Sequence, residues 1–263
     1  MRVVVCVKHV PDLQSERGFT ADGRVDRGQG DGTLNELDEN AVEAALALVE
    51  EHGGEVTVLT LGPDDAEDAV RRGLQMGATQ ALHVLDDAAA GSDVFGTATV
   101  LAAAVRHLAS TGDPVDLVMT GMASLDGVTS LLPAALAAEL DLPQLTLATE
   151  VDVDGDVVRV RRVLDHATEV LTAPLPALVS VTDTANEPRY PNFAGIMAAR
   201  KRAVEVVTLL DLGVDPATVG TAGARTEVVD TTPLPARENR VLIADDGDAG
   251  LRLAAYLVEN KLV

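Results

Sequence analysis

The chain has very few aromatic residues and a single cysteine. It contains two tyrosines, three phenylalanines and no tryptophan, and Cys6 has no second thiol with which to form an internal disulfide. The five histidines show no ligand spacing, so we expect neither a metal site nor a thiol redox pair. The sequence also lacks a serine–histidine–aspartate set, a paired-carboxylate signature and a nucleophile elbow. This pattern favours a binding or carrier protein over a hydrolase.

Positive charge and long apolar runs are scarce as well. Twenty Lys and Arg stand against 42 Asp and Glu, for a formal net charge of −22. Such an excess argues against binding to nucleic acid, and it indicates either a partner with a basic surface or simply a highly soluble protein. No stretch approaches the roughly 20 apolar residues that span a bilayer, and the N-terminus lacks a secretory cleavage site. We therefore predict a cytoplasmic protein without membrane insertion.

Apolar strands alternate with helical patterns along the first 140 residues. The run at 2–9 is typical of a strand buried on both faces of a sheet. Further strands are expected at 56–61, 81–85 and 115–120, and helices from about residue 35 to 52 and at 64–76, 94–110 and 131–140. This order predicts an α/β fold with a doubly wound, parallel, Rossmann-like sheet. Ligands of such sheets bind beyond the carboxyl ends of the strands.

The period of the pattern changes after Pro143. Residues 151–160 alternate around an Asp-Gly pair and predict a β-hairpin, and further strands are expected at 168–171, 177–182 and 203–209. We expect this half to add antiparallel structure to the edge of the sheet. The predicted domain is 1–210, and 211–263 is predicted to be an extended arm with a terminal helix at 249–259. That helix could pack on a partner subunit or on its own domain.

A turn at 121–130 follows the fourth predicted strand. Its small residues, hydroxyls and free N–H groups precede a helix, where the positive end of the helix dipole suits a phosphate. An ordinary strand-to-helix turn capped by Asp126 or Thr129 is the alternative. Cys6, Asn35 and Leu61 lie at or just after the ends of the first two strands, where an adenosine could bind. Cys6 itself is interpreted as a small core residue, because no cation-rich surroundings are evident.

A second unusual stretch, residues 186–202, combines Pro188, Pro191 and Gly195 with two of the five aromatic residues and ends in three basic ones. The prolines predict a shaped loop that leads into a short helix beginning near Gly195 or Ile196. We expect Phe193 to be an exposed apolar anchor for transient docking, and Tyr190 to be packed at the base of the loop. The basic run could also complement the C-terminal dipole of the short helix.

Several segments resemble the β subunit of electron transfer flavoprotein. The resemblance extends over nearly the whole chain and weakens after about residue 230. Its most specific part is the Glu-Pro-Arg-Tyr loop followed by Ile-Met and the basic run. The similar segments are 5–12, 35–45, 69–78, 116–121 and 186–202.

The resemblance implies a heterodimer with a larger α subunit, which holds FAD, and a fold of the adenine-nucleotide-binding type in which this chain binds AMP. Electrons would come from acyl-CoA and other flavin dehydrogenases, as in fatty acid β-oxidation, and pass to the electron transfer flavoprotein–quinone oxidoreductase. The implied AMP contacts are Cys6, Asn35, Glu36, Leu37, Asp38, Leu61, Ala123, Ser124, Asp126, Gly127, Val128, Thr129 and Ser130. The implied recognition loop, residues 184–202, would dock dehydrogenases through Glu187, Pro188, Arg189, Tyr190, Phe193, Ile196 and Met197.

Two positions depart from the pattern of this family. Thr129-Ser130 stands where many relatives have Thr-Gly, and Leu13 stands where some relatives place an aromatic residue near the flavin. Two alternatives remain. One is a bifurcating relative that binds a second FAD in place of AMP and meets NADH, and the other is a stand-alone adenine-nucleotide-binding protein.

Overall fold

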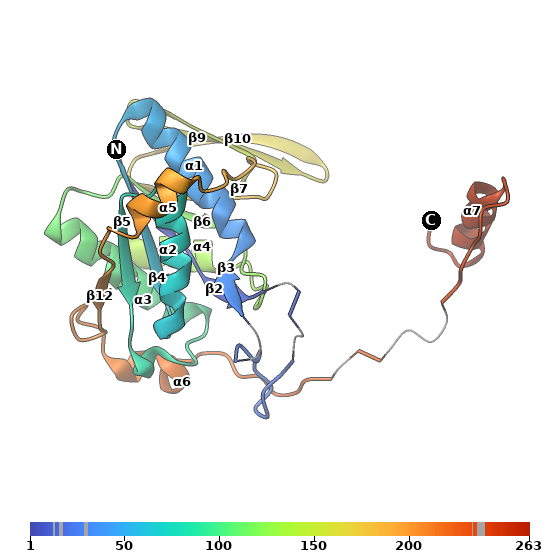
Figure 1. Cartoon of the computed structure of the whole chain (residues 1–263), viewed down its shortest axis with the longest axis horizontal. Helices are drawn as coiled ribbons and strands as arrows, with labels where there is room; N and C mark the ends of the chain where they lie inside the picture. The colour runs from blue at the N-terminus through green and yellow to red at the C-terminus, as the bar shows by residue number, and fades with distance from the viewer. Residues whose placement is uncertain (13, 16–17, 29–30, 233, 236–239) are drawn as a thin grey trace. The chain divides into compact units, whose positions relative to one another are not determined.

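The computed structural model describes residues 1–12, 14–15, 18–28, 31–232, 234–235 and 240–263. The chain divides into two compact units, Met1–Val229 and Asp230–Val263 (Figure 1). The first unit contains both stretches that the sequence analysis singles out, the 123–130 turn and the recognition loop.

A seven-stranded parallel sheet forms the centre of the first unit. Its strands lie in the order β12-β5-β4-β1-β6-β11-β7, and neighbouring strands pair in parallel. The predicted α/β fold with a parallel, doubly wound sheet is therefore confirmed. The strand bounds are β1 Arg2–Cys6, β4 Glu55–Leu61, β5 Gln80–Val84, β6 Leu117–Gly121, β7 Gln144–Ala148, β11 Ala177–Val181 and β12 Glu205–Val207.

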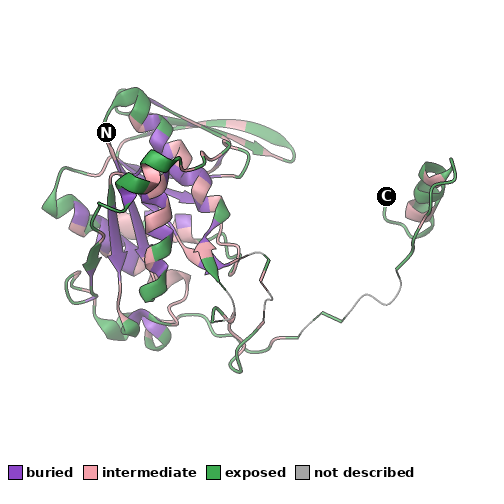
Figure 2. Cartoon of the chain, in the orientation of Figure 1, coloured by how far each residue is buried: buried purple, intermediate pink, exposed green. Residues whose placement is uncertain are grey.

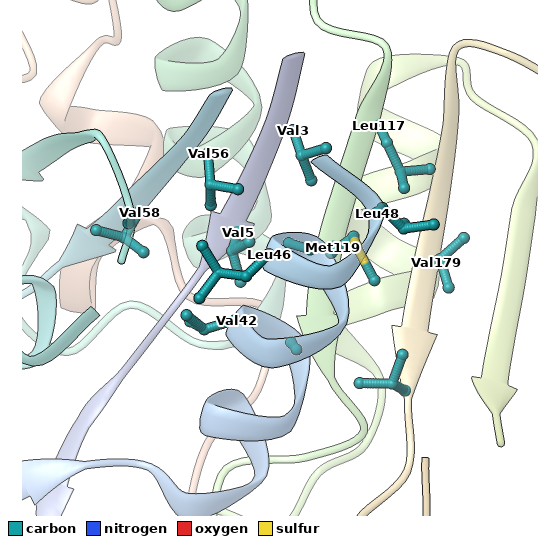
Figure 3. Packing of buried hydrophobic residues seen from close by; sticks show 14 of the residues in the cluster. Val3, Val5, Val42, Leu46, Leu48, Val56, Val58, Leu117, Met119 and Val179 are labelled. Atoms are coloured by element: carbon teal, nitrogen blue, oxygen red, sulfur yellow. The ribbon is translucent and has the colours of Figure 1, made fainter. Parts of the chain in front are cut away.

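Helices cover both faces of this sheet. On one face α1 packs Val42 and Leu46 against Val5 and Val56 of the strands (Figure 3). On the other face α3 and α4 pack against the alternate strand residues, which include Val4 and Leu59. Purple, buried residues therefore fill the strands in Figure 2. The helix bounds are α1 Glu36–His52, η1 Asp64–Ala66, α2 Glu67–Met76, η2 Asp87–Ala89, α3 Val94–Thr111, α4 Leu132–Leu140 and α5 Phe193–Ala199.

The position of the antiparallel strands was predicted wrongly. They do not extend the edge of the main sheet but form a separate three-stranded sheet of β8 (Glu150–Asp154), β9 (Val157–Leu164) and β10 (Ala167–Pro174). β11, which we had assigned to the same antiparallel half, lies between β6 and β7 in the parallel sheet. All five of its residues are buried, as in a strand covered on both faces. A two-stranded sheet of β2 (His9–Pro11) and β3 (Gly32–Leu34) follows β1.

The first unit extends beyond residue 210, where the sequence analysis placed the start of the arm. Val219 is fully buried, between η3 (Pro216–Thr218) and α6 (Gly220–Gly223). The Gly220 N–H donates to the Ser92 hydroxyl at 2.8 Å, and its positive φ brings the backbone close to the carbonyl of Ala88. These contacts attach residues 211–229 to the body of the first unit.

In the described residues of the second unit there is one helix, α7 (Ala249–Glu259). The Asp245 carboxylate accepts hydrogen bonds from the N–H groups of Gly247 and Ala249 at its start. Apolar side chains on α7, among them Leu251 and Val258, are exposed. Across the described residues of both units, no helix is long and apolar enough to cross a membrane.

Candidate functional site

The first candidate site lies where the winding of the main sheet reverses. β1 pairs with β4 on one side and with β6 on the other, and the connections after β1 and β5 run in opposite directions across the sheet. A sheet of this kind opens a crevice at the carboxyl ends of the two strands at the reversal. Here these ends are Cys6 and Gly121. Gly121 and Lys8, the second residue after Cys6, both bond to Asp38 in the first turn of α1.

Asn35 connects α1 to the 123–130 turn. Its fully buried side chain donates to the carbonyl of Ala123 at 2.9 Å and accepts from the N–H of Leu125 at 3.0 Å. Although Asn35 occupies the N-cap position of α1, its side chain makes no capping hydrogen bond to that helix. The amide is used to hold the turn against the helix.

Asp38 connects the same helix to both strand ends. Its carboxylate accepts hydrogen bonds from the N–H of Lys8 at 2.9 Å and from the N–H of Gly121 at 3.3 Å. Burial raises the pKa of Asp38 to about 7, against the opposing effect of its hydrogen bonds. The buried Asp38 side chain therefore links α1 to the segment after β1 and to the last residue of β6.

Two cations converge on Asp126 in the turn. The Lys8 ammonium lies 2.9 Å from Oδ1, and the Arg27 guanidinium lies 2.7 Å from Oδ2. Burial alone would raise the pKa of Asp126, but the charges and hydrogen bonds of Lys8 and Arg27 hold it well below its usual range. Burial lowers the pKa of Lys8, and Asp126 opposes that shift. The three groups together carry one more positive than negative charge, which removes the repulsion that Asp126 alone would exert on an anion.

The sequence analysis missed Lys8 and Arg27 as site residues. Lys8 had a usable signal, because it is the first charged residue after a fully buried strand and so lies at the carboxyl edge of the sheet. Arg27 had none, since it lies in a long polar loop and meets Asp126 across 99 positions of the chain.

The remaining residues of the turn are exposed. Gly127, Val128, Thr129 and Ser130 face solvent, and Val128 and Ser130 have positive φ angles of 49° and 51°. α4 begins at Leu132 without a side-chain cap, so neither Asp126 nor Thr129 caps it as the alternative reading required. Ser124 lies 3.5 Å from the Lys8 ammonium. The turn thus presents backbone and hydroxyl groups next to the Lys8–Asp126–Arg27 cluster.

The other predicted contact residues border this site. Cys6 is buried in the apolar cluster beneath α3 and α4, and burial raises the pKa of its thiol to about 12, which keeps the thiol protonated. Leu61 ends β4 and packs against the same cluster. Glu36 is exposed and Leu37 is half-buried at the start of α1. Leu13 lies outside the described residues.

The donors at this site fit the phosphate of a nucleotide. Lys8 and Arg27 supply positive charge, and the Ser124 hydroxyl lies 3.5 Å from the Lys8 ammonium. A hollow of about 150 Å³ adjoins Asp126 and is lined by Pro11, Gly18, Phe19, Val25 and Asp26. Ligand pockets usually measure roughly 300 to 1,000 Å³, so the hollow alone is too small for a whole nucleotide. Within the described part of the chain, no cluster of side chains could hold a metal ion.

The recognition loop forms a second, separate candidate site on α1 and α2. Phe193 is 79% exposed and begins α5, earlier than the start expected near Gly195, because the Asn192 side chain caps the helix through the N–H of Gly195. The prediction of an exposed Phe193 is confirmed. The prediction for Tyr190 is wrong, because this residue is 90% exposed and lies near the Arg72 guanidinium at the surface.

The other residues predicted for docking differ in exposure. Glu187 and Met197 are exposed, whereas Pro188 and Ile196 are half-buried. Arg189 is half-buried against α1, where it meets Glu43 and Glu50. In the basic run, Arg202 donates a hydrogen bond to the carbonyl of Thr79, which lies in the link between α2 and β5. Two exposed aromatic rings therefore stand together on a loop whose base is attached to the protein.

Asp38 predicts an unusual dependence of stability on pH. Its native pKa of about 7 lies above the ordinary value of 3.8, so the folded protein retains a proton that the unfolded chain releases as the pH rises from about 4 to 7. The contribution of Asp38 to the free energy of unfolding should therefore fall over this range, by up to about 1.4 kcal/mol per pH unit. Denaturant unfolding at pH 5 and pH 8 of the native protein and of Asp38→Asn tests this. Between pH 5 and pH 8, the free energy of unfolding of the native protein should fall by about 2 to 3 kcal/mol more than that of the variant. An equal change in both proteins would contradict the raised pKa of Asp38.

The fold and the first site together define a doubly wound α/β protein that carries Lys8 and Arg27 beside the turn at the switch point of its sheet. Residues 22–212 match the family model described as the electron transfer flavoprotein domain. The chain belongs to the electron transfer flavoprotein family and is similar to its β subunits, as the resemblance in sequence indicated.

Curated relatives agree over the full length. Electron transfer flavoprotein subunit beta of Mycobacterium leprae is 43% identical, with 99% of both chains covered. The protein of the same name from Megasphaera elsdenii is 32% identical over the whole of both chains. Protein FixA of Azorhizobium caulinodans is 36% identical over 93% of this chain and 89% of its own. The chain is thus an electron transfer flavoprotein subunit, and 99% or more of it is matched by the relatives from Mycobacterium leprae and Megasphaera elsdenii.

Proposed function

We propose that this chain is the β subunit of a heterodimeric electron carrier. Its α partner holds FAD, and the complex takes electrons from acyl-CoA and other flavin dehydrogenases and passes them to a membrane quinone oxidoreductase. The observation that carries this proposal is the pair of exposed rings, Tyr190 and Phe193, on a loop fixed to the body of a protein otherwise poor in aromatic residues. Exposed aromatic side chains on a fixed support are typical anchors of protein interfaces.

We further propose that the switch-point site binds AMP. Lys8 and Arg27 would bind its phosphate, and the N–H and hydroxyl groups of the exposed turn would add hydrogen bonds, as at other anion-binding turns. Asn35 and Asp38 would act indirectly, because their side chains already hold the turn and the strand ends. When bound, the FAD of the α subunit supplies the redox chemistry, and the residues of this chain supply binding and orientation.

The C-terminal unit, residues 230–263, is proposed to pack on the α subunit. The exposed apolar residues of α7, which include Leu251, Leu253 and Val258, would be covered there. Exposed apolar side chains on a helix are unfavourable in water, so their burial against the α subunit would lower the free energy of the complex.

Counting the nucleotides of the complex tests this assignment. The chain is co-expressed with α, the complex is purified and denatured, and the released nucleotides are identified by chromatography and mass. We expect one FAD and one AMP per heterodimer. Two FAD and no AMP would support the bifurcating alternative with NADH, and a stable chain with adenine nucleotide but no flavin would support a stand-alone nucleotide-binding protein.

A variant makes the count specific to the proposed phosphate contact. Lys8→Gln keeps an unbranched polar side chain, one bond shorter than that of lysine, but removes its charge, so the complex should retain its FAD and lose most of its AMP. Lys201→Gln, an exposed lysine after α5, is the matched control and should retain both nucleotides. Equal AMP content in the two variants would exclude Lys8 from the phosphate site.

A further inference from the structure

Arg189 makes the densest set of charged contacts in the described part of the recognition loop. Its Nε and Nη2 donate to the Glu43 carboxylate at 2.7 and 2.9 Å, and its Nη1 and Nη2 donate to the Glu50 carboxylate at 2.6 and 3.1 Å. Its backbone N–H also donates to Glu43 at 3.0 Å. Two bidentate ion pairs therefore join this one residue to two glutamates that lie about two helical turns apart on α1.

These contacts use most of the guanidinium. Nε has one N–H and each terminal nitrogen has two, and four of these five donors point to Glu43 or Glu50. An arginine that binds a carboxylate on another protein needs at least one edge of its planar guanidinium, with two N–H donors, free for that carboxylate. The guanidinium of Arg189 is bonded to its own chain. In this it differs from the neighbouring side chains of Tyr190 and Phe193, which are exposed.

The loop on either side of Arg189 is also attached to the two helices. The Asn40 side chain of α1 donates to the carbonyl of Asn186, and the Asn186 side chain donates back to the carbonyl of Asn40, both at 2.9 Å. After α5, Arg71 of α2 donates to the carbonyl of Arg202 at 2.7 Å. Between these two attachments, Arg189 gives the loop its only ion pairs to α1 among the described residues.

The position of Arg189 in the loop explains why its ion pairs to α1 matter for docking. It directly precedes Tyr190 and lies four residues before Phe193, so its placement sets the direction in which both exposed rings leave the body. Exposed rings on a mobile loop lose conformational freedom when a partner binds, and that loss weakens binding. A loop ordered beforehand by strong, charge-assisted hydrogen bonds avoids most of this cost.

We propose that Arg189 is a positioning residue, which orders the recognition loop through Glu43 and Glu50 and does not itself contact the dehydrogenase. This proposal rests on the docking role given to the loop under the proposed function. It replaces the direct docking role that the sequence resemblance implied for Arg189. Tyr190 and Phe193 keep the role of contacting the partner.

The experiment compares Arg189→Gln, Glu50→Gln and the double variant in the complex with α. An acyl-CoA dehydrogenase reduced by its acyl-CoA substrate donates the electrons, and KM for the complex and kcat are measured separately. Arg189→Gln should raise KM about tenfold and Glu50→Gln about threefold, with kcat nearly unchanged. The double variant should be no worse than Arg189→Gln, because both changes disrupt one unit. Arg189→Lys, which keeps one charge but not the fork, should restore part of the loss.

Amide hydrogen exchange provides the readout that a direct contact would not alter. In the unbound complex, residues 186–199 should exchange faster in Arg189→Gln and Glu50→Gln, with exchange elsewhere unchanged. Glu51→Gln, at an exposed neighbour of Glu50, is the matched control and should leave both KM and exchange unchanged. If Arg189→Gln raises KM while Glu50→Gln does not, or if exchange stays the same in all variants, the positioning role is wrong.

The same measurements distinguish the positioning role of Arg189 from the docking role of the recognition loop. If the Arg189 and Glu50 variants loosen the loop in hydrogen exchange but neither they nor Phe193→Ala alter KM, Arg189 orders the loop but the loop does not dock the dehydrogenase. If Phe193→Ala raises KM and the loop exchanges normally in the Arg189 variant, the docking function stands and the positioning role fails.

Discussion

Phe193→Ala is expected to lower kcat/KM for reduction of the complex by a flavin dehydrogenase by about 30-fold, equivalent to roughly 2 kcal/mol. Phe193 is 79% exposed at the start of α5, and Asn192 caps that helix, so the ring is held away from the body. A large apolar side chain in this position loses water contact only when a partner covers it, and its truncation removes that gain. Stopped-flow reduction of the flavin by the substrate-reduced dehydrogenase measures the effect.

Two controls make the Phe193 result specific to docking. FAD content and thermal unfolding should be unchanged, since the ring contributes little to the fold. Leu210→Ala removes another strongly exposed apolar side chain, outside the recognition loop, and should leave kcat/KM within about twofold. Equal kinetics for Phe193→Ala and the native complex would remove the recognition loop from the transfer step.

Gly121→Ala is expected to destabilise the first unit by about 3 kcal/mol and to abolish nucleotide retention. A Cβ at Gly121 would lie 2.6 Å from both Asp38 Oδ1 and the carbonyl oxygen of Leu37. One of these contacts is to backbone and cannot move without shifting the start of α1. The N–H of Gly121 would also lose its hydrogen bond to Asp38 if β6 and α1 separated. Denaturant unfolding and the nucleotide content of the complex with α measure the two effects.

Gly127→Ala is the matched control for Gly121→Ala. Gly127 belongs to the same turn, but the nearest atom to an added Cβ is the Ser124 hydroxyl at 3.6 Å, an ordinary contact. This variant should unfold within about 0.5 kcal/mol of the native protein. If both alanine variants are equally stable, the close approach of β6 to α1 does not limit this site.

Much of the fold follows from local pattern. The buried run of β1 and the apolar face of α1 both predicted their elements, because side-chain periodicity is set by the local backbone geometry. The parallel sheet also followed, since alternating strands and helices have few compact solutions. β11 was assigned to the wrong sheet, because a short apolar run does not state which strands will lie beside it. The place of β11 also depends on its neighbour β7, residues 144–148, which was not predicted as a strand.

The candidate sites were predicted in part. Local sequence identified the 123–130 turn, and the prolines and aromatic residues identified the recognition loop. The exposure of Phe193 was predicted correctly, but that of Tyr190 was not, because its position between two prolines does not reveal which of its faces the rest of the protein covers. Tyr190, expected inside, is the more exposed of the two. The AMP contacts, the α subunit and the partners remain proposals.

The sequence by itself determined the strand and helix alternation, the positions of the 123–130 turn and of the 186–202 loop, and the family to which the chain belongs, because each depends on residues that are contiguous in the chain. The charged partnerships were decided only by the tertiary structure. Lys8 meets Asp126 across 118 positions, and Arg189 meets Glu43 and Glu50 across 146 and 139. Ion pairs have no periodicity in sequence, so they form only where the topology of the sheet and helices places their groups within a few ångströms.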